Sequence, residues 1–314
     1  MSGHKELTQI FDKLLQPRIP PCAAGIERSS VSVVQLDRSR GAFVVKRAAT
    51  LNLPPELIRA SFDESNVEPQ RLAEALSDLA TSAGLLRQKK WCVALPEATA
   101  RSAILTVENA VGSRREVDEV IEWKIERTFG APAAELRVAR QQLPANEQKQ
   151  ERYLATAVRL SVLAEYEAAF AMLGWHAGVV LPRHVGEEQW LREGAGDGLL
   201  LSAHDEGFTA VLLRNGRPVT LRSVFCDPGE CDDELHRVLL FYRERSSPNG
   251  DGVPVNRLLV IGEGLDKNRV AEIARDSLGV SLRPLEAADI GLSIPGDLPF
   301  DTIAAPAGLA RMAW

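Results

Sequence analysis

The chain carries the same strand pattern twice, at residues 23–50 and at residues 199–224. Each copy reads as an apolar strand, a short polar break, a second strand, a turn and a third strand. The second copy turns at Asn215-Gly216, a pair typical of a type I′ hairpin, because both central residues take positive φ. Alternating helices and strands follow each copy, so the sequence predicts an α/β protein built from two related halves.

Length and composition limit which classes of protein the chain can belong to. A chain of 314 residues fits two domains, and 45% hydrophobic with 25% charged residues is ordinary for a soluble globular protein. The formal net charge of −6 gives no reason to expect a nucleic-acid partner. Four cysteines, Cys22, Cys92, Cys226 and Cys231, are few and scattered, and we interpret them as reduced thiols of a cytoplasmic protein.

Periodicity places the remaining elements. Helical spacing predicts helices at about 68–83, 162–173, 230–245 and 267–278, and apolar runs predict strands at 91–95, 175–181, 258–261 and 280–285. An N-terminal extension covers residues 1–21, and apolar spacing predicts an amphipathic helix at 5–15. We expect this helix to dock on its own domain, or to contact a membrane surface or a partner.

A compact unit interrupts the first half. Residues 103–107 alternate like a strand, and Ser113 and Glu116 are spaced as a capping box that opens a helix. Strand-like segments follow at 136–143 and 153–160, so the unit is a small strand-helix-strand-strand subdomain. A glycine-rich link at 194–198 marks the boundary with the second half.

Short motifs along nearly the whole chain carry a family resemblance. They are Gly25-Ile26-Glu27, Ser29-Ser30-Val31, Leu53-Pro54-Pro55, Val93-Ala94-Leu95-Pro96, Ile125-Glu126, residues 168–174, Arg214-Asn215-Gly216-Arg217-Pro218, Leu240-Phe241-Tyr242-Arg243, Ile261-Gly262-Glu263-Gly264 and Gly308-Leu309-Ala310. In this order they resemble the type IV pilus assembly protein PilM family, which is related to FtsA. The resemblance implies a two-domain actin-like ATPase (ribonuclease H-like) fold with an inserted small subdomain and a reduced second-domain insertion. The implied parts are 22–96 with 161–194, the insert 97–160, and 195–314.

The resemblance also implies a function. Members of the family are cytoplasmic and peripheral to the inner membrane, where they bind the cytoplasmic tail of a PilN-like membrane protein and act with the pilus motor or other assembly proteins. The tail lies in a groove between the first domain and the inserted subdomain, so Trp123 and Phe129 are candidate partner-binding residues, with core packing as the alternative. Membrane contact is expected to be indirect or through the N-terminal helix.

The family's nucleotide site is altered in this sequence. The residues that could hold a nucleotide are Glu27, Arg28, Ser29, Ser30, Gly207, Gly262, Glu263 and Gly264. The first break lacks the glycine that lets backbone N–H groups approach phosphates. Ser202 stands where ATP-binding members have Asp, while Asp205 and Glu206 add negative charge, and the segment after Ser223 is too short for the helical wall of an adenosine pocket.

We therefore expect a scaffold without efficient ATP hydrolysis and without a required cofactor. The alternatives are a functional ATP-binding protein of the same fold with ATP and Mg²⁺, or a GspL-like cytoplasmic module of type II secretion. Cys226 and Cys231 have no second pair of ligands nearby, and the five histidines form no Ser/His/Asp arrangement, so neither a metal site nor a nucleophilic triad is expected.

Overall fold

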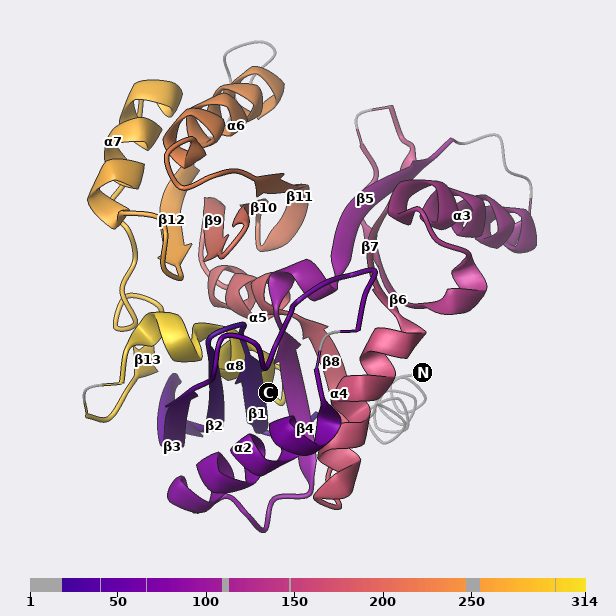
Figure 1. Cartoon of the computed structure of the whole chain (residues 1–314). Helices are drawn as coiled ribbons and strands as arrows, with labels where there is room; N and C mark the ends of the chain where they lie inside the picture. Colours follow the sequence, from indigo (N-terminus) through magenta and orange to yellow (C-terminus); the bar gives the residue numbers. More distant parts are fainter. Residues whose placement is uncertain are drawn as a thin grey trace, which may run out of the picture.

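The computed structural model describes residues 19–39, 41–65, 67–108, 113–146, 148–246, 255–296 and 298–314. These residues form three β-sheets with helices packed on them, arranged as two large lobes and one small lobe (Figure 1). The N-terminal helix predicted at 5–15 lies outside the described residues. Within the described ranges, every helix is too short or too polar to cross a lipid bilayer.

The first sheet has the strand order β13-β3-β2-β1-β4-β8. Its strands are β1 (Cys22–Ile26), β2 (Ser30–Ser39), β3 (Ala42–Asn52), β4 (Lys90–Leu95), β8 (His176–Pro182) and β13 (Leu292–Ser293). Helices α2 (Pro69–Ser82) and α4 (Leu160–Met172) pack against it through one apolar core. Helix α2 buries Leu72, Leu76 and Leu79, whose spacing places them on one face of the helix.

The second sheet repeats the pairing of the first. It has the order β11-β10-β9-β12, with β9 (Asp197–His204), β10 (Gly207–Arg214), β11 (Arg217–Phe225) and β12 (Val255–Ile261). In each sheet the first hairpin strand pairs antiparallel with the second and parallel with a later strand, which is β4 for β1 and β12 for β9. Because β3-β2-β1-β4 and β11-β10-β9-β12 follow the same plan, the predicted duplication is confirmed.

Helices α6 (Cys231–Ser246) and α7 (Lys267–Leu278) cover one face of the second sheet. The predicted turn at Asn215 and Gly216 is also confirmed, since both residues have positive φ, 49° and 73°. The strand predicted at 280–285 is wrong. That segment makes only an isolated bridge between Leu258 and Pro284, so its apolar residues pack against the sheet without extending it.

The third sheet belongs to the small lobe and has the order β5-β7-β6. Its strands are β5 (Arg101–Val107), β6 (Leu136–Leu143) and β7 (Glu151–Arg159), and helix α3 (Arg114–Phe129) packs on one face. The capping box is present: the amide of Glu116 donates to the hydroxyl of Ser113, and the amide of Ser113 donates to the Glu116 carboxylate at 3.0 Å. The predicted strand-helix-strand-strand unit is thereby confirmed.

Two helices, α5 (Arg183–Glu188) and α8 (Phe300–Arg311), lie between the large sheets (Figure 1). Helix α8 shares a core with both sheets, which includes Val34 of the first and Leu200 of the second, and α5 packs against α8. Helix α8 was not predicted, because Pro306 interrupts its pattern. Helix α8 packs on the first sheet, and β13 is a strand of that sheet, although both lie in the segment 195–314 that the resemblance assigns to the second domain.

The crossing of α5 and α8 depends on glycine. A Cβ on Gly308 would overlap the carbonyl oxygen of Gly186, and a Cβ on Gly186 would overlap that of Ala305. Glycine in a helix interior usually costs stability relative to alanine, so close backbone contact is the reason for its presence here. Contact this close fixes α5, and thereby the side chains that α5 carries, against the first sheet.

Replacing Gly308 by alanine is therefore expected to lower the free energy of unfolding by about 3 kcal/mol, because the new methyl forces two backbones apart. Urea denaturation followed by circular dichroism measures the change. Gly229→Ala is the matched control, since Gly229 has no heavy atom within 4 Å of its Cβ position. A Gly308 variant as stable as the wild type would contradict the close crossing.

Candidate functional site

The chain segments that follow the parallel strands of both large sheets meet at one place. Glu27 follows β1, Glu97 follows β4, Arg183 follows β8, and Gly262 follows β12. The carboxyl ends of parallel strands lie at one edge of a sheet, where α/β proteins usually bind ligands. We call this group the strand-end cluster and define it as Glu27, Glu97, Arg183, His184, Glu187, Thr209 and Gly262.

Arg183 lies at the centre of the strand-end cluster. Its guanidinium contacts the Glu27 carboxylate at 3.1 Å and the Glu187 carboxylate at 2.8 Å. The side chain of Glu187 is fully buried, and that of Arg183 is 7% exposed. A Cβ on Gly262 would lie 3.1 Å from the same guanidinium, so the glycine-rich turn packs directly against it. An arginine of the protein therefore occupies the point where the predicted phosphate-binding segments converge.

Glu97 anchors a second buried set of contacts. Its carboxylate accepts from Nδ1 of His184 at 2.6 Å and from the hydroxyl of Thr209 at 2.9 Å. Burial alone would raise the pKa of Glu97, but charge and hydrogen bonding from His184 outweigh it and hold the pKa at about 2. Burial would likewise lower the pKa of His184, and Glu97 with neighbouring carboxylates raises it instead. The contact between Glu97 and His184 joins the end of β4 to α5, and the hydrogen bond from Thr209 joins it to β10.

Little space remains between the two polar breaks. The cavity there has a volume of about 20 Å³, which holds about one water molecule. Small-molecule sites are typically about 300 to 1,000 Å³. Four acidic residues line the cavity beside one arginine and one histidine, so a phosphate there would meet more negative than positive side chains: Glu27, Glu97, Asp205 and Glu206 against Arg28 and His204.

The carboxyl group of Glu27 has an unusual environment. Burial raises its pKa to about 7, the carboxylates of Glu187 and Glu97 act in the same direction, and Arg183 opposes them. Glu27 is therefore held between one cation and several anions. Its surroundings suit an internal ion pair with Arg183.

The predicted nucleotide residues have different surroundings. Arg28 and Ser29 are exposed in the first turn, and Ser30 begins β2. Gly207 has φ of 136°, and a Cβ there would overlap the carbonyl oxygen of Val224, so close packing of the hairpin accounts for this glycine. Glu263 and Gly264 are exposed, with open space beside Gly264. Of the predicted set, Glu27 and Gly262 come together around Arg183.

Sequence reasoning missed Arg183, Glu97 and His184. A usable signal existed for Glu97, which directly follows Pro96 at the carboxyl end of a buried strand. Arg183 and Glu187 are four residues apart, a spacing that puts them on one helix face. Burial of that helix, which makes the pair significant, is visible only in the structure.

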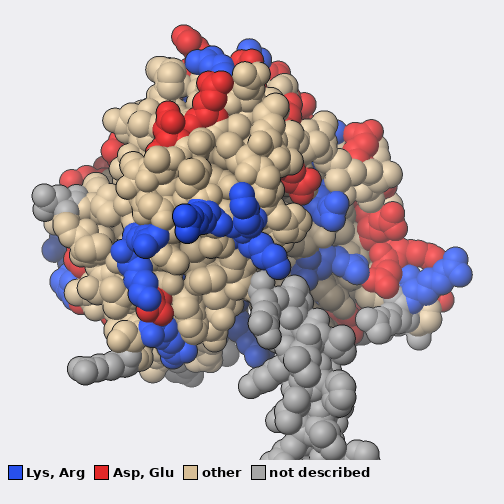
Figure 2. All heavy atoms as spheres, turned by 90° about the horizontal axis from the view of Figure 1, so that it is seen from below, with Lys and Arg blue, Asp and Glu red and all other residues tan. Residues whose placement is uncertain are grey.

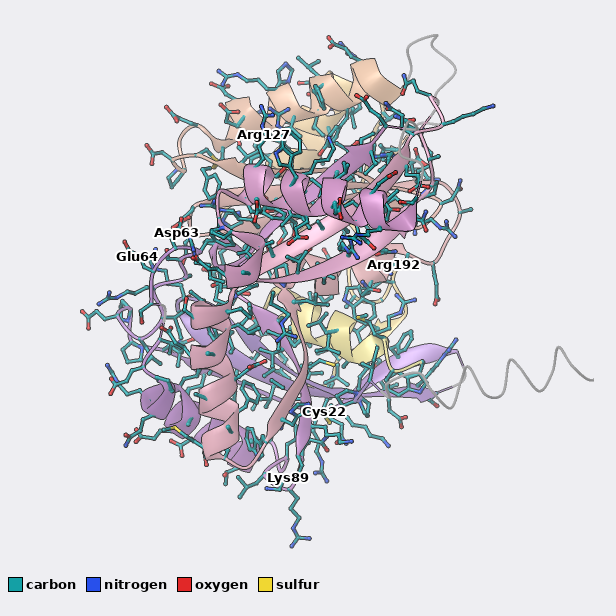
Figure 3. All side chains as sticks on the ribbon, turned by 90° about the vertical axis from the view of Figure 1, so that its right-hand side faces the viewer. Cys22, Asp63, Glu64, Lys89, Arg127 and Arg192 are labelled. Carbon is teal, nitrogen blue, oxygen red and sulfur yellow. A yellow bond between two sulfur atoms is a disulfide. The ribbon has the colours of Figure 1, made fainter. Side chains whose placement is uncertain are left out.

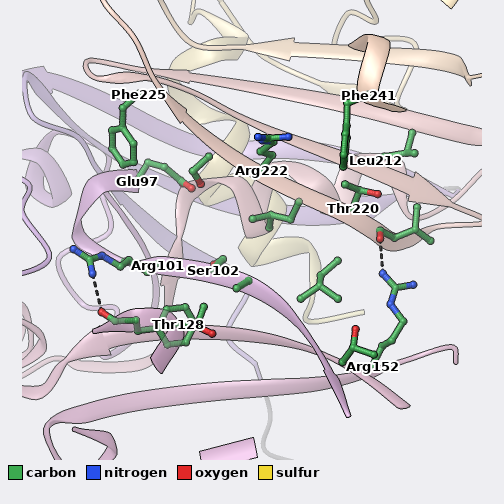
Figure 4. Close-up of a pocket in the computed structure, with 18 of the residues that line it drawn as sticks. Glu97, Arg101, Ser102, Thr128, Arg152, Leu212, Thr220, Arg222, Phe225 and Phe241 are labelled. Atoms are coloured by element: carbon green, nitrogen blue, oxygen red, sulfur yellow. Dashed lines mark hydrogen bonds between the residues drawn. The ribbon is translucent and has the colours of Figure 1, made fainter. Parts of the chain in front are cut away.

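A much larger groove opens beside the cluster, between the small lobe and the second sheet (Figure 4). Its volume is about 1760 Å³. The lower wall contains β5, with Arg101, Ser102 and Thr106, and the upper wall contains β11 and α6, with Phe225 and Phe241. Both β5 and β11 are edge strands of their sheets. The first domain contributes residues 59–63 to the same groove.

Aromatic and cationic side chains mark the upper wall. Phe225 is 68% exposed, although Phe is usually buried, and its ring lies 6.3 Å from that of His204. The guanidinium of Arg222 lies 5.2 Å from the Phe241 ring. On the lower wall, Arg152 donates to the carbonyl oxygen of Val219 and thereby ties the small lobe to β11.

Trp123 and Phe129 do not act as a pair in the structure. Phe129 is 1% exposed and belongs to the core of the small lobe, although it also lines the groove. Trp123 is 54% exposed and does not line the groove, and the Arg127 guanidinium lies 5.4 Å from its ring. Residues six positions apart on a helix point in different directions, which explains the separation.

The expectation of four reduced thiols is wrong for two of them. Cys226 and Cys231 form a disulfide, with their Cα atoms 5.6 Å apart, because the turn between β11 and α6 folds back on itself. Cys22 and Cys92 are free and buried. Burial raises the pKa of Cys22 to about 11 and that of Cys92 to about 12, so both stay protonated. In the described part of the chain, no cluster of ligands is suited to a metal ion.

Comparison with known proteins supports the fold. No family model matches the sequence, and no curated protein sequence matches it significantly. A solved PilM-PilN type IV pilus biogenesis complex is similar in structure, with a TM-score of 0.75, 20% identity, and coverage of 95% of this chain and 99% of that one.

Weaker similarities come from two other solved structures. The cytoplasmic domain of EpsL from Vibrio cholerae, an inner-membrane component of type II secretion, has a TM-score of 0.48 at 10% identity, covering 93% of each chain. A Bacteroides thetaiotaomicron protein with an actin-like ATPase fold has a TM-score of 0.49 at 9% identity, covering 92% of this chain and 94% of that one. The predicted fold class is confirmed: the chain has a two-domain actin-like fold, in a form similar to that of the PilM-PilN complex.

Proposed function

We propose that this protein is a PilM-like scaffold of a type IV pilus or a related secretion machine, which binds the cytoplasmic tail of a PilN-like inner-membrane protein without efficient ATP hydrolysis. The observation that carries the proposal is the groove of about 1760 Å³ between two edge strands, in a fold similar to that of a PilM-PilN complex. This groove lies between the small lobe and the second sheet, with a contribution from the first domain at 59–63, whereas the family resemblance implies a groove between the first domain and the small lobe. Such a protein would be cytoplasmic and peripheral to the inner membrane.

The groove suits an extended peptide. An edge strand has one side without a neighbouring strand, so its backbone groups can pair with an added strand, while pockets for alternate side chains provide specificity. Strands β5 and β11 supply such edges on opposite walls. Phe225 supplies an exposed aromatic surface for an apolar side chain of the tail.

The strand-end cluster supports the second half of the proposal. Its Arg183 pairs with two carboxylates where a nucleotide's phosphates would lie, and the remaining cavity holds about one water molecule. These ion pairs join segments of the first lobe, while the hydrogen bond from Thr209 to Glu97 and the contact of Gly262 with Arg183 connect them to the second lobe. The scaffold would keep its closed shape without a cofactor.

Isothermal titration with synthetic cytoplasmic tails of PilN-like proteins tests the proposal. We expect binding, and we expect Phe225→Ala to weaken it about 30-fold, as for an aromatic anchor at the centre of an interface. Trp123→Ala is the matched control, because Trp123 is an exposed aromatic residue outside the groove. It should bind within about twofold of the wild type.

Two results would count against the proposal. Absence of binding at high micromolar peptide would remove the scaffold function. Binding that is weakened by Trp123→Ala and not by Phe225→Ala would keep the function but move the partner to the outer face of α3.

A further inference from the structure

The end of the molecule opposite the groove carries unpaired positive charge. We call it the basic pole and define it by the cations Arg47, Arg87, Lys89 and Lys90 and the apolar residues Leu86 and Met172. Segments 84–90 and 171–176, which form most of it, contain no Asp or Glu, although the whole chain has a net charge of −6. Figure 2 shows this end of the molecule, with a band of Lys and Arg across it and Asp and Glu mostly near the edges.

The basic pole is built on a rigid base. Strand β4 begins at Lys90 beside the start of β8, and the amide of His176 donates to the carbonyl oxygen of Lys89 at 2.8 Å. Behind them, the rings of Trp91 and Trp175 pack with centroids 5.0 Å apart. The side chain of Arg47 donates to the carbonyl oxygen of Gly84, which ties β3 to the same loop. The cations are thus presented by ordered strand ends.

Three of these cations have no carboxylate partner in the part of the chain that the structure describes. Among the described residues, no ion pair includes Arg87, Lys89 or Lys90. Leu86 is 47% exposed and Met172 is 61% exposed at the same end. Exposed apolar side chains flanked by cations suit the interface of an anionic bilayer, where headgroups attract the charges and the apolar groups enter the acyl boundary.

The path of the chain points to the same end. Strand β1 begins at Cys22 and runs parallel to β4, with Ala23 opposite Cys92, so the chain before β1 joins the domain beside the basic pole. The sequence at 5–15 has apolar residues on one face of a helical pattern, which is typical of interfacial segments.

We propose that the basic pole is a docking surface for an anionic phospholipid bilayer. The contact is independent of the partner groove, which lies past the opposite end of β4. That strand has six residues and is about 20 Å long at about 3.3 Å per residue. A partner tail of about six extended residues spans the same distance, so both contacts can form at one membrane.

Vesicle flotation of the full chain tests the proposal. Vesicles of phosphatidylcholine with 30 mol% phosphatidylglycerol should bind the protein, pure phosphatidylcholine vesicles should not, and raising the salt concentration should release it. Each cation near an anionic surface raises affinity about fivefold, so Arg87→Glu, Lys89→Glu and Lys90→Glu together should lower the partition coefficient at least about 100-fold. Replacing Leu86 and Met172 by Ser should lower it further.

The matched control has the same change in charge on α3: Arg115→Glu, Lys124→Glu and Arg127→Glu. Arg127 and Lys89 lie near opposite ends of the molecule in Figure 3. This control should bind vesicles within about threefold of the wild type. Thermal melts of both variants verify folding, and tail binding by the pole variant should be unchanged, which separates this proposal from the partner groove.

The proposal is overturned by any of three results. The wild type could fail to bind anionic vesicles, or bind neutral vesicles equally well. The pole variant could bind as tightly as the α3 control. Phe11→Ser could abolish binding while the pole variant keeps it, which would assign the contact to the N-terminal segment alone.

Discussion

Replacing Arg183 by methionine is expected to lower the free energy of unfolding by about 3 to 5 kcal/mol. The substitution leaves the carboxylates of Glu27 and Glu187 close together without the cation that now lies between them. Because Glu187 is fully buried, water cannot replace the lost partner. Urea denaturation at pH 7 measures the effect.

A variant with all three charges removed isolates the cause. Adding Glu27→Gln and Glu187→Gln to Arg183→Met removes the uncompensated charges, so it should restore most of the lost stability. The three residues touch, so their effects are expected to be strongly non-additive. A loss below about 1 kcal/mol in the single variant would mean that the arginine does not compensate the charges of Glu27 and Glu187.

Thermal melts of the wild type test nucleotide binding. Mg·ATP at millimolar concentration should leave the melting temperature of the wild type unchanged, because the cavity between the two polar breaks holds only about one water molecule. A ligand at 100 times its Kd adds about 2.7 kcal/mol of stability, which a melt detects readily. A clear upward shift would favour the alternative of a functional ATP-binding protein.

Acid is expected to destabilise the protein by about 3 kcal/mol through Glu97 alone. The pKa of Glu97 falls from 4.5 to about 2 on folding. A lowered folded pKa contributes stability that is fully present above pH 4.5 and is lost as pH falls toward 2. Converting the difference at 1.36 kcal/mol per pH unit gives the magnitude. Glu97→Gln should flatten this acid limb, as measured by urea denaturation between pH 2 and pH 6.

Above about pH 5, the free energy of unfolding is expected to fall as pH rises, which is the opposite of the effect of Glu97. The pKa of Glu27 is raised from 4.5 to about 7 and that of His184 is raised from 6.5. A raised folded pKa gives stability that is present below the unfolded value and is lost as pH rises through the folded value. Stability should therefore be greatest near pH 5 and fall toward pH 8. Glu27→Gln should reduce that fall, and an unchanged slope would contradict the assigned environment of Glu27.

Local sequence patterns predicted much of the architecture. Apolar alternation and the Asn215-Gly216 turn predicted both hairpins, and Ser113 with Glu116 predicted the start of α3, because each signal acts within a few residues. The prediction failed where an element depends on distant partners. Helix α8 contains Pro306 and is held by its contact with α5, and residues 280–285 lack a ladder of strand hydrogen bonds.

The site was predicted only in outline. The polar breaks at Glu27 and after Ser202 identified the correct strand ends, since a repeated hairpin dictates where its turns lie. The contacts made there could not be predicted. The side chain of Arg183 enters from the segment after β8, far from Glu27 in the sequence, and the shared carboxylates arise from packing within the first lobe.

The sequence by itself determined the duplicated α/β plan and the inserted small lobe, since both follow from local spacing of apolar residues, turns and caps. Tertiary structure alone decided that Arg183 pairs with Glu27 and Glu187, that Phe129 is buried while Phe225 is exposed, and that Lys89 and Lys90 share an end with Met172. Charge pairing and burial depend on distances between segments far apart in the chain, and only packing sets those distances.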